Sequence, residues 1–126
     1  MRFIPTRIHG VIDYLWGIAL IASPWLFGFA TGGAAQWTAI VFGLGAILYS
    51  LVTVYELGAL RVIPMSMHLA LDGVAGAVLA ASPWLFGFAG EVVWPHLLFG
   101  LFSVVASLVS RTDPRLAARA RDATSR

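Results

Sequence analysis

The nonapeptide ASPWLFGFA stands at residues 22–30 and again, unchanged, at residues 81–89. The match extends beyond it: an ungapped alignment at this offset of 59, starting at His9 and His68, has 13 identities in 22 positions. A repeat of this quality indicates an internal duplication. The fold is therefore expected to consist of two copies of one unit.

The segments that follow each nonapeptide also match, at a slightly different offset. With a shift of 57 residues, Trp37 aligns with Trp94, and the tripeptide FGL at 42–44 aligns with FGL at 99–101. The two-residue difference falls in the loop between the two matches. Each copy of the unit is therefore predicted to contain a pair of helices.

The composition indicates a membrane protein. The chain has 126 residues, of which 60% are hydrophobic and 11% charged, and its mean hydropathy is +0.87. Soluble domains carry roughly 25% charged residues. The chain has too few polar side chains to cover a soluble globule of this size, so lipid is the expected solvent for most of its surface.

Four apolar runs divide the chain, and each is typical of a membrane helix. A helix needs roughly 20 residues to cross a hydrocarbon core of about 30 Å. The fold class is therefore predicted to be all-α. The expected helices lie at about 8–29, 37–56, 65–88 and 92–110.

Because each unit crosses the bilayer twice, the chain returns to its starting side after each unit. The two units then share one orientation and are related by a pseudo-two-fold axis along the membrane normal. We predict a four-helix transmembrane bundle made of two tandem helical hairpins. The first repeat occupies residues 1–58, the second occupies residues 59–110, and a basic tail follows at 111–126.

The arginines predict the orientation of the bundle. Arg2, Arg7, Arg61 and the arginines of the tail at 111–126 fall on one side, whereas the opposite side carries only Glu91. Positively charged loops remain in the cytoplasm. We expect a multi-pass protein of the inner (cytoplasmic) membrane with both termini in the cytoplasm.

Ionisable side chains recur at equivalent points of the two units. His9 and Asp13 stand four residues apart, as do His68 and Asp72, so each pair shares one helix face. Ionisable residues within a membrane span are costly and mark a candidate functional site. These four residues form the predicted polar or ion site if the two faces meet across the pseudo-two-fold axis.

Three interpretations of this site remain open. The favoured one is structural: each Asp pairs with its own His, or with Arg7 or Arg61, near the headgroups and ties the hairpins together. The second is a path for protons or cations, and the third is a divalent metal site. Because the chain has no cysteine and no known metal or cofactor motif, we expect neither a resident metal nor a cofactor.

The Ser-Pro-Trp triplets predict a change in the path of the first helix of each unit. Proline lacks the N–H and disfavours helical geometry in the residue before it, so the helix either bends there or stops and restarts. The aromatic residues that follow are expected to form a belt at the outer interface. The predicted bend and anchor residues are Ser23, Pro24, Trp25, Ser82, Pro83 and Trp84, and the belt extends to Phe27, Phe29, Phe86 and Phe88.

Small residues are predicted to bring helices into close contact. In lipid, small side chains at a spacing of about four residues let two helix backbones approach each other. Gly17 and Gly76 are equivalent in the alignment. The predicted packing residues are Gly17, Gly73, Gly76, Ala77 and Ala80.

The duplicated Ser-Pro-Trp triplets, each in the first helix of a two-helix unit, resemble the SPW repeat family of small bacterial and archaeal integral membrane proteins. The resemblance covers residues 8–110. It implies an architecture of four membrane helices in two repeats. It implies no activity, substrate or catalytic residue.

The functional expectation is a non-enzymatic membrane module: a structural or interaction protein, or an accessory subunit. Its expected partners are the lipid bilayer and a second copy of itself or a larger membrane complex. The alternative is a small ion- or proton-conducting oligomer that uses His9, Asp13, His68 and Asp72. No catalytic residue is predicted, and a net charge of +2 does not support nucleic-acid binding.

Overall fold

The computed structural model describes residues 2–112 and 123, so most of the predicted basic tail lies outside the described residues. The described residues form four α-helices and no strand, which confirms the predicted all-α class. The prediction placed the helix ends too late, because the first three helices end three to five residues earlier than expected. The helices are α1 (Thr6–Leu26), α2 (Ala34–Leu51), α3 (Met65–Leu85) and α4 (Trp94–Val109).

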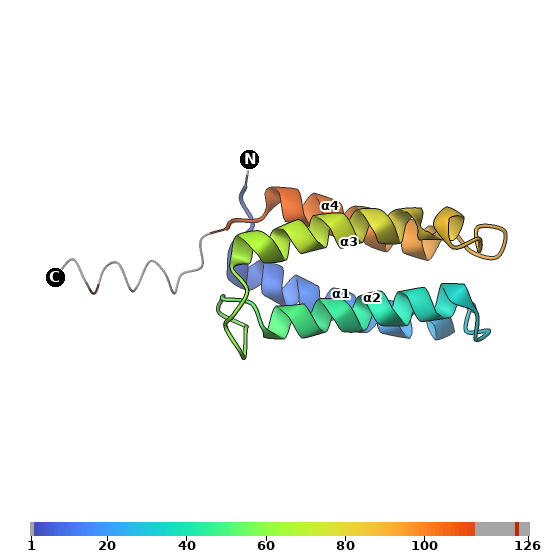
Figure 1. Ribbon diagram of the computed structural model, residues 1–126, viewed down its shortest axis with the longest axis horizontal. Coiled ribbons are helices and arrows are strands. Elements are labelled where there is room, and N and C mark those ends of the chain that lie inside the picture. Colours follow the sequence, from blue (N-terminus) through green and yellow to red (C-terminus); the bar gives the residue numbers. More distant parts are fainter. Residues whose placement is uncertain (1, 113–122, 124–126) are drawn as a thin grey trace.

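The helices lie side by side in two closely packed pairs, α1 with α2 and α3 with α4 (Figure 1). Glycines allow the close approach within each pair. A Cβ added to Gly76 would lie 2.7 Å from the Gly100 carbonyl oxygen, and a Cβ added to Gly43 would lie 2.8 Å from the Gly17 carbonyl oxygen. The backbones therefore touch at equivalent points of the two pairs.

The predicted packing residues differ in burial. Gly17, Gly76 and Ala80 are buried, and a Cβ on Gly73 would contact the Ser107 side chain of α4 at 3.2 Å. Ala77 is exposed, so its packing role stays a prediction.

The serine before each proline donates a hydrogen bond to a helix carbonyl that the proline leaves without a donor. Proline has no N–H to donate to the carbonyl four residues earlier, which for Pro24 is Leu20. The Ser23 hydroxyl donates to that carbonyl instead, at 2.6 Å. In the second copy the Ser82 hydroxyl donates to the carbonyl of Leu79 at the same distance. Both helices therefore continue through their prolines, so the predicted alternative of a stop and restart is wrong.

The end of the nonapeptide terminates each helix. Gly28 has φ of 74° and Gly87 has φ of 75°, a left-handed conformation that favours glycine. The Phe29 N–H donates to the Pro24 carbonyl at 2.8 Å, as the Phe88 N–H does to that of Pro83. This arrangement is a Schellman motif, in which the chain reverses at the glycine and satisfies a free carbonyl.

We predict that Ser23→Ala will lower the free energy of unfolding by about 1–3 kcal/mol, because it leaves the buried Leu20 carbonyl without a donor. The measurement is an unfolding titration in mixed micelles. In a Pro24→Ala background the restored N–H serves Leu20, so the same serine change should cost well under half as much. An equal cost in both backgrounds would show that the hydroxyl does not act through this carbonyl. The exposed Ser66 provides the control, Ser66→Ala.

The residues of the predicted aromatic belt differ in exposure, and the belt prediction is wrong for Phe29 and Phe88. Trp25 is 61% exposed and Trp84 is 58% exposed, so their role as interface anchors stays a prediction. Phe29 and Phe88 are 3% and 5% exposed, because the reversal at the glycine turns the chain back toward the core. Within each Ser-Pro-Trp triplet the serine and the proline are also buried, so the tryptophan is the exposed member. Outside the triplets, Phe27 and Phe86 are exposed as well.

The two helix pairs are joined by their ends. The N–H of Ile4, just before α1, donates to the Val109 carbonyl at the end of α4. In the same way the N–H of Ile63, just before α3, donates to the Val52 carbonyl just after α2. The segment before α1 thus contacts the end of α4 in the same way as the segment before α3 contacts the residue after α2. The Arg2 guanidinium reinforces the contact with α4 by donating to the Ser107 and Ser110 carbonyls at 2.9 and 2.8 Å.

Apolar side chains cover the outer surface of all four helices. Examples are Leu15 on α1, Leu48 on α2, Val74 on α3 and Leu108 on α4, each more than 60% exposed. Two helices, α2 and α3, are long and apolar enough to cross a bilayer by length and composition, and α4 is a shorter apolar helix.

Candidate functional site

The four ionisable residues singled out in the sequence meet between the two helix pairs. All four are buried, and one ligand atom from each lies within 4.8 Å of the others. His9 and Asp13 come from α1, and His68 and Asp72 come from the equivalent turns of α3. We call these four residues the His–Asp cluster.

The shortest contacts in the cluster cross from one helix pair to the other. His9 Nε2 lies 2.8 Å from Asp72 Oδ2, and His68 Nε2 lies 2.6 Å from Asp13 Oδ2. Within each helix the corresponding His–Asp distances are 3.0 and 3.3 Å. The favoured prediction, in which each Asp pairs with the His of its own helix, is therefore only part of the arrangement. Each Asp also contacts the His of the other helix, and these contacts between α1 and α3 are the shorter ones.

Each histidine uses its second ring nitrogen on a hydroxyl. His9 Nδ1 lies 2.6 Å from Ser110 Oγ, and His68 Nδ1 lies 2.8 Å from Thr53 Oγ1. The Ser110 hydroxyl donates its own hydrogen to the Ala106 carbonyl, and the Thr53 hydroxyl donates to the Tyr49 carbonyl. Each hydroxyl oxygen therefore accepts from the imidazole, which places a hydrogen on both Nδ1 atoms.

This tautomer determines the chemistry at the centre of the cluster. With Nδ1 protonated, each Nε2 carries either a lone pair or a second hydrogen. A bare Nε2 and a carboxylate oxygen less than 3 Å apart would set two lone pairs against each other, so a proton lies in each short contact. Two protons balance two carboxylates, and the buried cluster has no net charge whichever atom of each contact holds its proton. Neutrality makes such a cluster tolerable in a medium of low polarity.

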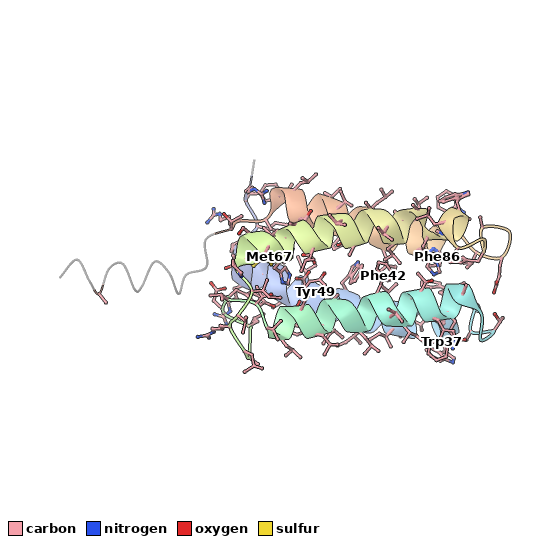
Figure 2. The ribbon with its side chains drawn as sticks, viewed as in Figure 1. Trp37, Phe42, Tyr49, Met67 and Phe86 are labelled. Carbon is pink, nitrogen blue, oxygen red and sulfur yellow. The ribbon has the colours of Figure 1, made fainter. Side chains whose placement is uncertain are left out.

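Tyr49 makes the cluster asymmetric. Its hydroxyl donates a short hydrogen bond to Asp72 Oδ1, and Figure 2 shows the side chain pointing from α2 into the space between the pairs. At the offset of 57, the residue equivalent to Tyr49 is Ala106, which cannot donate. Accordingly the Asp72 side chain is 4% exposed and the Asp13 side chain is 12% exposed. The accessible edge of the cluster lies at Asp13.

The segment between α2 and α3 covers the cluster from the end of the bundle. The Tyr55 ring is fully buried and stands 5.8 Å from the His68 ring, centroid to centroid. Burial raises the pKa of the Tyr55 hydroxyl, so this wall of the site stays uncharged. Thr6 at the start of α1 donates to the Glu56 carboxylate at 2.7 Å and holds the same segment down.

The core beyond the cluster, toward the nonapeptides, is apolar. Leu20 and Leu79 are fully buried there and share a hydrophobic cluster with Phe29 and Phe88. Phe42 packs against the same cluster and points from α2 toward the other pair in Figure 2. The fully buried Leu20 and Leu79 therefore form an apolar layer next to the His–Asp cluster, and the buried His96 lies beyond it, against Phe29 and Phe88.

The role of His96 becomes visible only in the structure. It is fully buried, and its Nε2–H donates to the Ala35 carbonyl at 2.9 Å. Its ring packs at a tilt against Phe29 and Phe88, with centroids 5.2 and 4.7 Å away. It joins the two pairs at the nonapeptide end, although the equivalent residue in the first copy is Ala39. The contacts of the Thr53 and Ser110 hydroxyls with the histidines were not predicted either. The feature of the sequence that pointed to them is that the two residues align with each other at the offset of 57.

Comparison with known proteins identifies one similarity. A family model described as the SPW repeat domain matches residues 7–110 of the chain. No curated protein and no solved structure matches.

Proposed function

The chain belongs to the SPW repeat family, and from this premise we propose that it is a small integral membrane protein that serves as a non-enzymatic interaction module. In this proposal all four helices cross the inner membrane as two tandem hairpins of the same orientation. The His–Asp cluster locks the hairpins together, and the apolar outer surface packs against a second copy or a larger membrane complex.

The proposed orientation rests on the distribution of charge. Arg2, Arg7 and Arg61 lie at the end of the bundle where α1 begins, α4 ends and the segment between α2 and α3 lies. Glu91 lies in the turn between α3 and α4, at the opposite end of the bundle. Its carboxylate accepts a hydrogen bond from the Thr31 hydroxyl at 3.0 Å. Basic residues favour the cytoplasmic side, so both termini are placed in the cytoplasm, and the exposed Trp25 and Trp84 lie at the outer interface.

The single observation that carries the structural role is the apolar layer beyond the cluster. A proton or ion path needs polar groups or water through the whole span. Here the fully buried Leu20 and Leu79 stand between the His–Asp cluster and the nonapeptide end. Both ring nitrogens of each histidine are paired, Nε2 with a carboxylate and Nδ1 with the hydroxyl of Ser110 or Thr53. These features support a lock between helix pairs in preference to conduction.

Flux through liposomes tests this proposal. We expect the purified protein to give no proton or monovalent-cation flux above that of empty liposomes, at any pH. Flux that the Asp13→Asn, Asp72→Asn double variant abolishes would overturn the structural role and establish conduction. If the double variant does not fold, the native protein alone decides the matter, because any flux above empty liposomes contradicts the lock.

Self-association can be measured in the same liposomes. The chain has no cysteine, so Ala59→Cys, at an exposed loop position, introduces one labelling site. We expect energy transfer between donor- and acceptor-labelled chains that persists as the protein is diluted in lipid. Transfer that falls to the level of random proximity would rule out a stable homo-oligomer and leave a different membrane protein as the partner.

A further inference from the structure

We propose that the His–Asp cluster binds a divalent transition-metal ion of the Zn²⁺ class, with one ligand from each of its four residues. The ligands are His9 Nε2, His68 Nε2, Asp13 Oδ2 and Asp72 Oδ2. This proposal goes beyond the proposed function, because the cluster joins the two helix pairs whether it holds a metal ion or two protons.

The donor set suits such an ion. Imidazole nitrogen favours zinc and its neighbours over Mg²⁺ and Ca²⁺, and two imidazoles with two carboxylates form a four-coordinate site. A tetrahedral site with bonds of about 2.0–2.1 Å separates its ligand atoms by about 3.3 Å. The four His–Asp contacts measure 2.8, 3.0, 2.6 and 3.3 Å. These four contacts need to lengthen by about 0.7 Å or less to reach that separation, and the His–His and Asp–Asp pairs of ligand atoms lie within 4.8 Å of each other.

The groups behind the ligands are those a metal site requires. A metal-binding histidine usually donates its other ring N–H to a fixed acceptor, which sets the tautomer and the ring orientation. Ser110 and Thr53 do this for the two histidines. Tyr49 donates to the other oxygen of Asp72, so Asp72 Oδ2 remains directed at the centre. Three of the four ligands, His9, His68 and Asp72, are thus held in place from behind.

Charge gives an independent argument. The cluster holds two protons between two histidines and two carboxylates, as derived from its hydrogen bonds. A divalent ion that replaces both protons leaves two neutral imidazoles, two carboxylates and two positive charges, so the net charge remains zero. The exchange costs no uncompensated buried charge. The partly exposed Asp13 side chain gives the ion its route to the centre.

Calorimetry on tag-free, chelator-treated protein in detergent tests the proposal. We expect Zn²⁺ to bind at one ion per chain and to release about two protons, counted by repeating the titration in buffers of different ionisation enthalpy. Mg²⁺ should bind at least about 100-fold more weakly. Co²⁺ should give the visible absorption of a four-coordinate nitrogen and oxygen site.

Variants locate the bound ion. His9→Ala should abolish one-to-one binding, and Ser110→Ala, which removes no ligand, should weaken it about 10–100-fold. His96→Ala removes a buried imidazole outside the cluster and should leave binding unchanged. The absence of saturable Zn²⁺ binding would overturn the proposal, as would unchanged binding by His9→Ala. If the variants fail to fold, proton release by the native chain still decides, because ions bound at exposed carboxylates release almost none at neutral pH.

Discussion

Replacing Asp72 with asparagine will lower the free energy of unfolding by about 3–5 kcal/mol in the presence of a chelator. Asp72 accepts from His9 through one carboxylate oxygen and from Tyr49 through the other. Asparagine has no charge and a single oxygen, so it cannot accept from both Tyr49 and a protonated His9 as the two carboxylate oxygens do. Either a buried donor loses its acceptor or His9 gives up its proton to accept from the asparagine amide. The measurement is reversible unfolding in mixed micelles, followed by helical circular dichroism.

Two comparisons make this prediction specific. Asp13→Asn should cost less than Asp72→Asn, because Asp13 has no counterpart of the Tyr49 bond and its side chain is more exposed. Glu91→Gln makes the same chemical change at an exposed site and should cost under about 0.5 kcal/mol. A cost for Asp72→Asn no larger than that of the Glu91 control would contradict the lock, and the reverse order of the two aspartates would contradict the role of Tyr49.

The second large effect is expected at the contact between α3 and α4. A Cβ on Gly100 would overlap the carbonyl oxygen of Gly76 and the backbone nitrogen of Ala80. Neither backbone group can move aside as a side chain can, so Gly100→Ala must force the helices apart. We expect it to lower the free energy of unfolding by about 3 kcal/mol, at the upper end of overpacking effects. The same unfolding assay measures it.

Gly45 supplies the matched control for this substitution. It lies within α2, and a Cβ there would meet nothing within 4 Å. Gly45→Ala should be neutral or stabilise the protein by up to about 1 kcal/mol, because alanine favours the helix. If Gly100→Ala and Gly45→Ala had the same effect, the close backbone contact would not contribute to stability.

Much of the fold could be predicted because the repeated sequence presents each signal twice. Runs of apolar residues predicted the helices, and the identity of His9 with His68 and of Asp13 with Asp72 singled out the four residues that meet in the core. The helix ends were placed late, because apolar residues continue past the point where the hydrogen-bonded turns stop. In the second helix, for example, α2 ends at Leu51 although the apolar residues run on.

Other features of the site depend on tertiary structure and could not be predicted. A spacing of four residues is compatible with pairing inside one helix and across two, and only the approach of α1 to α3 selects the crossed contacts. Thr53 and Ser110 lie beyond or at the ends of their helices, where helical periodicity no longer says which way a side chain points. Phe29 is buried and Phe27 exposed because of the left-handed glycine between them.

The crossed contacts make the two repeats depend on each other. His9 receives its carboxylate from Asp72 and its hydroxyl from Ser110, whereas His68 receives them from Asp13 and Thr53. Each repeat therefore completes the histidine of the other and leaves its own incomplete. A single repeat is half of a reciprocal pair, so one repeat alone, as a monomer, lacks the carboxylate and the hydroxyl that its histidine contacts across the bundle.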